Sequence, residues 1–547
     1  MGFLGILETK VTDVPGTVQL DEHCFSATGQ HAAHPKHDTG KNSHIVLSPQ
    51  PANDPNDPLN WHPLKKLSIT MIVGLGSCIY AAAYGHLFDA GTVVLAETFD
   101  RPIPDIVKTS GYQLLAAGAI GPLVAACARK WGKRPVFIMS SLFGLVGSIV
   151  GSTTNSYSGL LAARLIQGLS MPAYESIVGS MVGDMYFVHQ RGLFISVIGF
   201  VLAVVANLAP AVCGPITFNL GWKYLFYLCI PITAVQTILL VLFAPETQYR
   251  RVAPVPSVTS DADDSGSDSA EEKWARVRDV ETSSDPQLMA PAKKSMWQEM
   301  AIFSGTYSEE NFVQLLIAPF AVCMNLVVLW TVLLSGYLTA TYVAQAYVLA
   351  QIFAAPPYLL NASGIGYLFF GPFIGGTLAS ILFALSMDPL IKFCSWRNRG
   401  VYEPEYRLIP LVGGLLVGAG LFGWGALVQD GASVYATAAL HGLVMFGVVT
   451  ANDSLYTYTL DAFRSVSSEI FVASAMVKNF IFFAFSYFVS SWTATAGPAH
   501  VFDVFGGAAC GLVATGLAVF FCGKRYRAYW ATNNLLEKLH IQGHGEW

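Results

Sequence analysis

Long segments without any formal charge are the feature that most constrains this chain. Four of them lack Asp, Glu, Lys and Arg over about twenty residues: 67–88, 109–128, 224–245 and 504–523. A helix needs about 20 apolar residues to cross the hydrocarbon core of a bilayer. Charged residues make up only 12% of the 547 residues, roughly half the ~25% of soluble domains. The sequence therefore excludes a water-soluble globular enzyme and predicts an all-α membrane protein.

Apolar windows predict twelve transmembrane helices, six on each side of a long polar interruption. The expected limits are 67–88, 109–128, 135–153, 159–183, 194–217, 224–245, 316–347, 362–386, 408–428, 433–457, 468–491 and 502–523. Two halves of six helices are typical of secondary transporters that are built from repeats.

This division predicts five segments. Residues 1–66 and 247–312 are polar, so we expect a disordered N-terminal arm and an acidic, Ser-rich linker, both cytoplasmic. The two six-helix halves should comprise 67–246 and 313–523, followed by a cytoplasmic tail at 524–547. Phosphorylation of the linker would add charge and adjust turnover, although its disordered composition alone accounts for its sequence.

Basic residues near the spans predict the orientation, because Lys and Arg are retained on the cytoplasmic side. With both termini cytoplasmic, the inside segments near the membrane hold seventeen Lys and Arg, and the outside segments hold three. Asn361, in the sequon Asn-Ala-Ser, then lies outside and is the expected glycosylation site in a secretory compartment. Asn452 begins a second sequon, but it lies inside a predicted span and should be unmodified.

Several classes of function are disfavoured by the composition. The net charge of −5 argues against a nucleic-acid binder. The nine cysteines have no metal-ligand spacing, and no phosphate-binding glycine loop or nucleophile–base pair stands out. We therefore expect no metal, no cofactor and no catalytic residues.

Short motifs make the assignment more specific. The string Ala-Arg-Lys-Trp-Gly-Lys-Arg-Pro at 128–135 resembles the loop signature of the major facilitator superfamily, and Arg-Leu-Ile-Gln-Gly at 164–168 resembles its fourth-helix motif. Further matches lie at 221–222, 245–247, 356–358, 398–405, 478–479 and 523–525. From about residue 54 to residue 527, the chain resembles the fungal drug:proton antiporter-like branch, which includes histidinol and polyamine permeases.

This resemblance implies the major facilitator fold and proton-coupled transport of a small organic solute by alternating access. Efflux of a drug-like compound or secondary metabolite is the first expectation. Uptake of an organic cation, amine or nutrient is the alternative, and a substrate sensor without net transport is a third. The implied setting is a monomer in the plasma membrane, with the lipid bilayer, the small-molecule substrate and protons as its partners.

The loop signature departs from the family pattern at one position. An acidic residue usually stands three positions before the glycine, where this chain has Arg129 ahead of Gly132. The basic loop helps to retain this side in the cytoplasm, and we also expect it to close a gate by pairing with Asp184 or Glu246. The expected gate residues are Arg129, Lys130, Lys133, Arg134, Asp184, Arg191 and Glu246.

Charged residues inside spans are functional candidates, because a charge in the bilayer is costly. Arg164 and Glu175 are eleven residues apart, which returns to nearly the same helix face about 16 Å along the axis. Glu175 can bind and release a proton, whereas Arg164 stays charged; static pairing or helix packing is the alternative for each. Asp453 and Lys478 are expected to form a buried pair, and the alternative is that Asp453 binds a cationic substrate.

The superfamily resemblance implies that the first, fourth, seventh and tenth helices line the central path. Their polar and aromatic residues are the cavity candidates: Tyr80, Tyr84, Tyr174, Asn325, Trp330, Tyr337, Asn452 and Tyr456. Aromatic rings can hold an organic cation, although Trp and Tyr also form belts at the membrane interface. Gly336 is expected to bend the seventh helix, with helix packing as the alternative.

Overall fold

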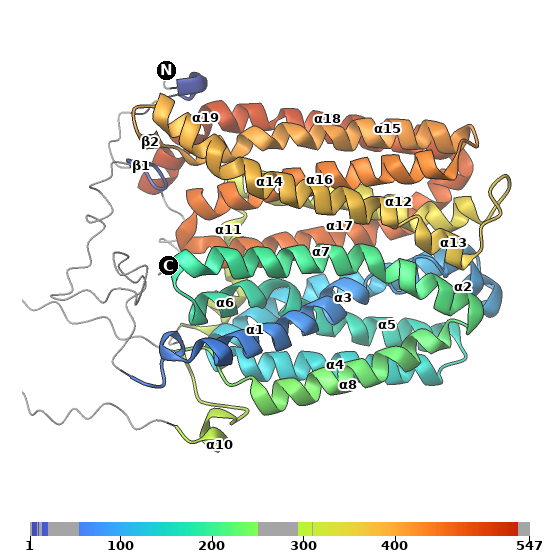
Figure 1. The fold of residues 1–547 in the computed structure, drawn as a ribbon, viewed down its shortest axis with the longest axis horizontal. Coiled ribbons are helices and arrows are strands. Elements are labelled where there is room, and N and C mark those ends of the chain that lie inside the picture. The colour runs from blue at the N-terminus through green and yellow to red at the C-terminus, as the bar shows by residue number, and fades with distance from the viewer. Residues whose placement is uncertain are drawn as a thin grey trace, which may run out of the picture.

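The computed structural model describes residues 3–7, 9, 14–19, 54–249, 294–308 and 310–533. These residues form a bundle of long helices that run along a common direction (Figure 1). Eleven helices within the described part are long and apolar enough to cross a membrane. Large apolar side chains such as Met71, Leu242 and Leu385 are 51–70% exposed on the outside of the bundle, as expected for a surface that faces lipid rather than water.

The N-terminal half is built from the elements between residues 58 and 243. They are η4 (Pro58–Asn60), α1 (Pro63–Gly76), the π-helical η5 (Ser77–Ala83), α2 (Thr92–Phe99), α3 (Ile103–Trp131), α4 (Lys133–Thr153), α5 (Tyr157–Pro172), the π-helical η6 (Ala173–Ile177), α6 (Val178–Met185), α7 (Val188–Asn219) and α8 (Lys223–Phe243).

The C-terminal half follows the short α10 (Met296–Glu299). Its elements are α11 (Phe312–Val322), α12 (Leu326–Phe353), α13 (Ala362–Tyr367), α14 (Phe370–Arg397), β2 (Val401–Tyr402), η7 (Pro404–Gly414), α15 (Leu415–Gln429), α16 (Val434–Ala462), η8 (Arg464–Val466), α17 (Ser467–Ala496), α18 (Pro498–Ala514) and α19 (Gly516–Thr532).

The helices are consistent with the twelve expected spans. The expected fourth span, which runs through α5, η6 and α6, is not among the eleven long apolar helices; these three elements carry three charged residues, Arg164, Glu175 and Asp184. The expected seventh span is interrupted at residues 323–325, where the Asn325 side chain accepts the backbone N–H of Val327 and Val328 and so begins α12. The helix is not interrupted at Gly336, because α12 runs continuously from Leu326 to Phe353. A Cβ atom at Gly336 would lie 3.1 Å from Ile481 of α17, so this glycine serves close packing.

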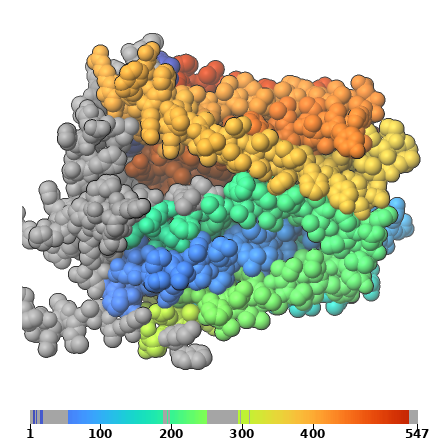
Figure 2. Space-filling model, in the orientation of Figure 1, coloured from blue at the N-terminus to red at the C-terminus, as the bar shows by residue number. Residues whose placement is uncertain are grey.

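Two seams join the halves, which lie against each other in Figure 2. In the first seam α3 packs along α17, where a Cβ atom on Gly111 would lie 1.9 Å from the Ser486 hydroxyl. In the second, α7 packs on α13, where a Cβ atom on Gly366 would lie 2.5 Å from the Pro210 carbonyl oxygen. Small residues allow this close approach of helix backbones.

One end of the bundle carries a two-stranded sheet, and we call it the sheet end. The strand β1 (Val18–Gln19) pairs antiparallel with β2, with Val18 opposite Tyr402. Nearby, Ile6 is buried with Cys394 and Tyr402. These described residues of the expected N-terminal arm therefore pack on the C-terminal half, which the prediction of a disordered arm did not anticipate.

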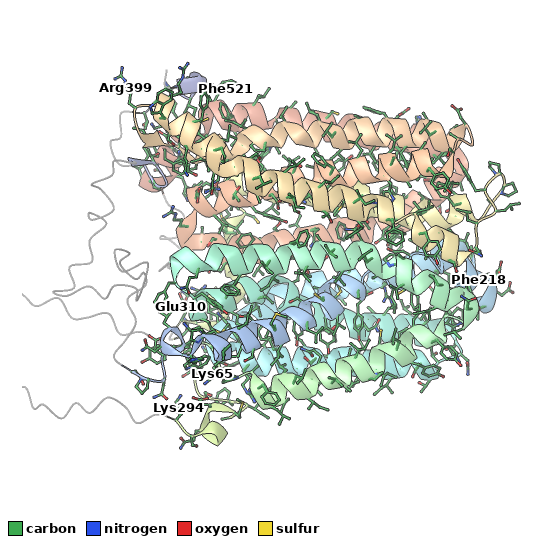
Figure 3. The ribbon with its side chains drawn as sticks, viewed as in Figure 1. Lys65, Phe218, Lys294, Glu310, Arg399 and Phe521 are labelled. Atoms are coloured by element: carbon green, nitrogen blue, oxygen red, sulfur yellow. The ribbon has the colours of Figure 1, made fainter. Side chains whose placement is uncertain are left out.

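The sheet end also carries the described part of the linker. Figure 1 places α10, β1, β2 and the end of α19 there, and Figure 3 places Lys65, Lys294, Glu310 and Arg399 there, with Phe218 at the opposite end. Lys65 of α1 and Glu299 of α10 form an ion pair of 2.7 Å. Most of the expected linker, 250–293, lies outside the described residues, as does 534–547 of the expected tail.

Candidate functional site

An ion pair inside the bundle joins the two halves. Lys478 of α17 donates from Nζ to Oε1 of Glu175 in η6, and Asn479 donates from Nδ2 to Oε2 of the same carboxylate at 3.1 Å. The side chains of Lys478 and Glu175 are only 23% and 16% exposed. Glu175 lies in a π-helical turn that directly follows Pro172, and such turns are frequent at functional sites.

Asp453 has a different environment from the one we expected. The predicted pair with Lys478 is not formed, because Lys478 contacts Glu175 instead. Asp453 is half-buried in α16, and its carboxylate has no hydrogen bond or ion pair with any described residue. The structure therefore leaves one acid of the path helices without a protein partner among the residues it describes.

Arg164 is fully buried inside the N-terminal half. Its guanidinium donates to the Tyr84 carbonyl oxygen at 2.9 Å, to Gln167 at 3.1 Å and to Ser110 at 3.3 Å, and it lies 4.9 Å from the Phe88 ring centroid. All of these partners belong to the same half. Arg164 and Glu175 therefore share one span but differ in their contacts, since only Glu175 reaches the other half.

Asp89 is a residue near this site that sequence reasoning missed. It acts electrostatically on Arg164, and its carboxylate lies 2.7 Å from Nδ1 of His86. Both residues lie in the turn between η5 and α2; His86 falls at the end of the predicted first span, 67–88, and Asp89 directly after it. The short spacing of His86 and Asp89 was a signal for this pair.

Three predicted cavity tyrosines point into the N-terminal half. The side chains of Tyr80, Tyr84 and Tyr174 are fully buried. Their hydroxyls contact residues of α4 and α8: Gln236 at 3.2 Å from Tyr80, Ser148 at 2.6 Å from Tyr84, and Ser141 at 2.6 Å from Tyr174. Because these hydroxyls are satisfied within the half, we do not assign them to the central path.

The five candidates of the C-terminal half divide into two groups. Asn325 caps α12, and Trp330 and Tyr337 hydrogen-bond to Thr515 and the Phe505 carbonyl oxygen at 2.8 and 3.2 Å. Asn452 and Tyr456 instead lie on the face of α16 that meets α12. Asn452 donates to Thr339 at 3.0 Å, and the Tyr456 hydroxyl accepts from Ser335 at 3.1 Å. Of the eight candidates, these two lie beside Asp453.

The loop after α3 is held within the N-terminal half. Lys133 forms an ion pair of 2.5 Å with Asp184, and the Glu246 carboxylate accepts the backbone N–H of Lys133 and Arg134 at 3.1 and 3.0 Å. Burial raises the pKa of Glu246, and these hydrogen bonds oppose that effect. Gly132 is required here, because its φ is +102° and an added Cβ atom would lie 2.3 Å from Glu246.

The expected pairing of the basic loop with Asp184 and Glu246 is present, but it lies within one half. Lys133, Arg134, Asp184 and Glu246 all belong to one half, so a rocking motion of the halves does not break their bonds. The Arg134 guanidinium donates to backbone carbonyl oxygens, including those of Val241 and Met300 at 2.8 and 2.9 Å. The side chain of Arg191 lies outside the described part of the structure.

Arg129, in the last turn of α3 before this loop, crosses between the halves. It forms an ion pair with Glu469, in the first turn of α17, and a second one of 3.5 Å with Glu310. Lys130 donates to the Glu310 carbonyl oxygen at 3.1 Å. An acid is favoured at a helix N-terminus. The loop therefore carries a base where the family pattern has an acid, and the acid stands on the facing helix.

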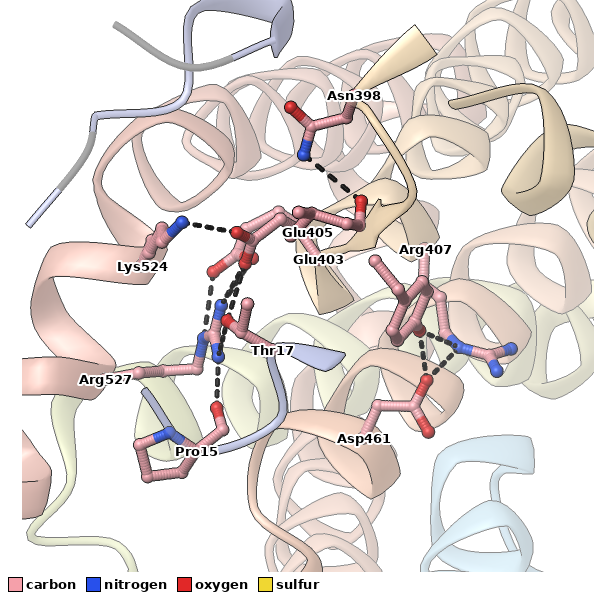
Figure 4. A network of polar contacts seen from close by, with 11 residues as sticks. Pro15, Thr17, Asn398, Glu403, Glu405, Arg407, Asp461, Lys524 and Arg527 are labelled. Atoms are coloured by element: carbon pink, nitrogen blue, oxygen red, sulfur yellow. Dashed lines mark hydrogen bonds and ion pairs between the residues drawn. The ribbon is translucent and has the colours of Figure 1, made fainter. Parts of the chain in front are cut away.

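The C-terminal half has a related network with the opposite charges (Figure 4). Arg527, near the end of α19, is 1% exposed and contacts Glu403 at 3.1 Å and Glu405 at 2.7 Å. In the N-terminal half an acid after the last helix, Glu246, holds a basic loop. In the C-terminal half a base in the last helix holds an acidic loop. The two halves thus make related contacts between a loop and their last helix, with the charges exchanged.

This network also binds the N-terminal segment. The Thr17 hydroxyl donates to Glu403 at 2.7 Å, and Arg527 donates to the Pro15 carbonyl oxygen. Arg407 forms an ion pair with Asp461 at the end of α16. The partners in this cluster lie far apart in the chain, so the sequence alone does not bring them together.

The expected glycosylation site is exposed. Asn361 caps α13, and its Oδ1 accepts the backbone N–H of Gly364 at 2.9 Å. Figure 1 places α13 at the end of the bundle opposite the sheet end.

Sequence comparison gives consistent matches over most of the chain. A profile described as Major Facilitator Superfamily matches residues 68–486. An uncharacterized MFS-type transporter of Schizosaccharomyces pombe is 23% identical over 556 residues, covering 95% of this chain and 94% of the relative. Protein HOL1 of Saccharomyces cerevisiae is 23% identical over 559 residues, covering 91% and 93%. The efflux pump dotC of Dothistroma septosporum is 26% identical over 184 residues, covering 33% and 31%.

Solved structures share the fold. A peptide transporter POT in complex with sulfate matches with a TM-score of 0.57 at 15% identity, covering 85% of this chain and 96% of that chain. The xylose transporter XylE from E. coli, in a partially occluded inward open conformation, matches with a TM-score of 0.54 at 13% identity, covering 82% and 98%.

Proposed function

This chain belongs to the Major Facilitator Superfamily and is a transporter rather than an enzyme, and on that premise we propose that it moves a small organic solute across the membrane by alternating access, driven by protons. The transporting unit is a monomer with halves at 67–246 and 313–523, joined by the linker at 247–312. Its sheet end faces the cytoplasm, because the basic residues near the spans gather on that side.

The observation that carries this proposal is the ion pair between Glu175 and Lys478. It joins the two halves within the bundle, and one of its members can bind a proton. Protonation removes the negative charge of Glu175 and with it most of the attraction between the halves. The proton gradient therefore acts on the contact that must break for the halves to separate.

A second cross-half contact supports alternating access. Arg129 and Glu469 join α3 to α17 at the sheet end, so this end opens only when their ion pair breaks. We propose this pair as the gate, in preference to the contacts of the basic loop with Asp184 and Glu246, because those contacts lie within one half. Proton binding at Glu175 and opening at the sheet end then involve the same helix, α17, because it carries both Lys478 and Glu469.

Efflux of a drug-like compound or secondary metabolite is the proposed direction, and the similarity to the efflux pump dotC supports it. We place the protein in the fungal drug:proton antiporter-like branch and in the plasma membrane, with a glycan on Asn361. Uptake of an organic cation or amine is the second candidate, because Asp453 is an acid beside the path that has no partner among the described residues.

Metabolite profiling tests this proposal even while the substrate is unidentified. Cells with and without the protein are compared, together with their medium, at two external pH values. Efflux predicts compounds that are depleted inside and enriched outside, by an amount that depends on pH. Accumulation inside would instead establish uptake, and no difference between the cells would contradict transport.

A further inference from the structure

We infer that the sheet end of α14 binds the headgroup of an anionic phospholipid in the cytoplasmic leaflet. The surface is formed by Lys392, Phe393, Trp396 and Arg397, and we call it the α14 headgroup site. This inference uses the orientation proposed above, and it concerns a lipid partner of the protein rather than the transported solute.

The first argument is that the bases of this surface have no partner within the protein. Lys133 and Lys524, at the same end of the bundle, form ion pairs with acids of the protein. Lys392 and Arg397 are exposed, as is Arg399, which follows the helix at the sheet end (Figure 3). None of these three side chains forms an ion pair or hydrogen bond with a described residue. Three positive charges are therefore available to an anion from outside the protein.

The second argument is the order of the side chains around α14. At ~100° per residue, Arg397 lies about 140° around the helix from Lys392. Trp396 and Phe393 lie between them, at about 40° and 100° from Lys392, and they are 73% and 57% exposed. Two bases therefore flank two aromatic rings on one outward face. Tryptophan and basic side chains of this kind are typical of helix ends at the level of the lipid headgroups.

The third argument is the apolar surface that leads to this face. Leu378, Leu382 and Leu385 are exposed on α14, and at ~100° per residue they lie within the same arc as the aromatic rings. Lys392 follows the first residue of α14, Phe370, by 22 residues, or about 33 Å along the axis. This length is close to the ~30 Å of the hydrocarbon core. An acyl chain that lies along the leucines therefore brings its headgroup to the bases.

An anionic phospholipid fits this surface better than a soluble anion does. Phosphate oxygens accept charge-assisted hydrogen bonds from guanidinium and ammonium groups, and the cytoplasmic leaflet is rich in anionic lipids. A soluble phosphate would contact the bases alone, whereas a phospholipid also covers the rings and the leucines. Asp388 is an exposed acid one turn before Lys392, but it lies about 6 Å further from the sheet end and forms no ion pair with a described residue.

Lipid binding to the purified full chain tests the inference. Native mass spectrometry counts the lipids bound to the detergent-solubilised protein as lipid is added. The two probes are palmitoyl-oleoyl phosphatidylserine and the phosphatidylcholine with the same acyl chains. The variants are Arg397→Gln, Arg397→Lys, and Arg397→Gln combined with Lys392→Gln. Lys294→Gln is the matched control, because Lys294 is an exposed base of the same end that lies outside α14 (Figure 3).

We expect the wild type to bind phosphatidylserine more tightly than phosphatidylcholine. Each base that is removed should weaken phosphatidylserine binding by about fivefold, since a base near an anionic surface is worth ~1 kcal/mol. The double variant should therefore lose about 25-fold if the two effects add. Arg397→Lys keeps the charge and should retain most of the affinity, and Lys294→Gln should retain all of it. The unfolding midpoint in phosphatidylcholine should stay unchanged, because the altered side chains are exposed.

Two results would overturn the inference: equal binding of both lipids to the wild type, or a folded double variant that keeps the preference for phosphatidylserine. Glycerol phosphate separates a lipid site from a site for soluble phosphate. At the concentration at which phosphatidylserine saturates the protein, it should not displace the lipid, because it has no acyl chain to contact the leucines. Displacement would overturn the assignment to a lipid. These measurements need no gradient, so their outcome is independent of proton-driven transport.

Discussion

Glu175 of the N-terminal half and Lys478 of the C-terminal half form an ion pair, although 303 residues separate them in the chain. Both side chains are less than a quarter exposed. A charge in this setting is stabilised by its partner far more than by solvent, so the pair fixes how the two halves contact each other.

The pair predicts unequal effects of single and double substitutions. Lys478→Met leaves the Glu175 carboxylate without its partner and should destabilise the protein by about 3 kcal/mol, because removing one member of a buried ion pair typically costs ~3–5 kcal/mol. Adding Glu175→Gln removes the uncompensated charge and should recover most of this loss. Thermal unfolding of the purified variants measures both. Additive losses in the double variant would show that the two side chains do not interact.

Exchange of charges tests the contact at the sheet end. Arg129→Glu places three acids together, since Arg129 contacts both Glu469 and Glu310, so transport should fall strongly. Arg129→Glu combined with Glu469→Arg restores opposite charges across the halves and should recover a large part of the flux. The matching exchange of Lys133 and Asp184 lies within one half and should affect stability more than flux. If the Arg129 and Glu469 exchange recovers nothing, their contact is not a gate.

Two glycines of α3 provide a matched test of the seam between α3 and α17. Gly111→Ala places a methyl group 1.9 Å from the Ser486 hydroxyl, whereas Gly121→Ala meets nothing within 4 Å. Overpacking typically costs about 1–3 kcal/mol, and Ala in a helix interior gains about 1 kcal/mol over Gly. We therefore expect Gly111→Ala to lower the unfolding midpoint and the flux, and Gly121→Ala to preserve the flux and raise the midpoint slightly. Equal behaviour of the two variants would contradict the close packing of this seam.

The orientation can be tested through the glycan. Treatment with a glycosidase should increase the electrophoretic mobility of the wild type and leave Ser363→Ala unchanged. Ser363→Ala is preferable to Asn361→Gln, because it removes the sequon and keeps the Asn361 cap of α13, which is worth about 1 kcal/mol. Asn452→Gln should retain the shift. A wild-type protein from a secretory compartment that carries no glycan would remove this support for the orientation.

Local sequence predicts where the helices lie in the chain well. It predicts poorly how each helix is rotated about its own axis. Charge-free segments of about twenty residues indicate the spans, and the cost of charge in lipid identifies Glu175 and Lys478 as important. The direction of a side chain such as Tyr174 depends on how its helix is rotated against its neighbours. Its hydroxyl meets Ser141 of α4 rather than the path, and the identities of these residues do not reveal that.

Partners across the halves were the hardest to predict. Lys478 is 25 residues from Asp453 in the sequence, so the neighbouring helix was the natural place to seek its partner. Lys478 pairs with Glu175 instead, and this pairing depends on how α17 packs against the N-terminal half. By contrast, the break before α12 could have been predicted, because Asn325 stands directly before an apolar run and asparagine is a favoured helix cap.

Proton-driven transport by Glu175→Gln in reconstituted vesicles tests the central claim most directly. The solute identified by profiling is supplied under an imposed pH gradient, and Glu97→Gln, which alters an exposed acid of α2, is the control. We predict that Glu175→Gln no longer concentrates the solute, although it is inserted in amounts equal to the wild type, and that Glu97→Gln concentrates it normally. Undiminished concentration of the solute by Glu175→Gln would contradict proton coupling through this residue.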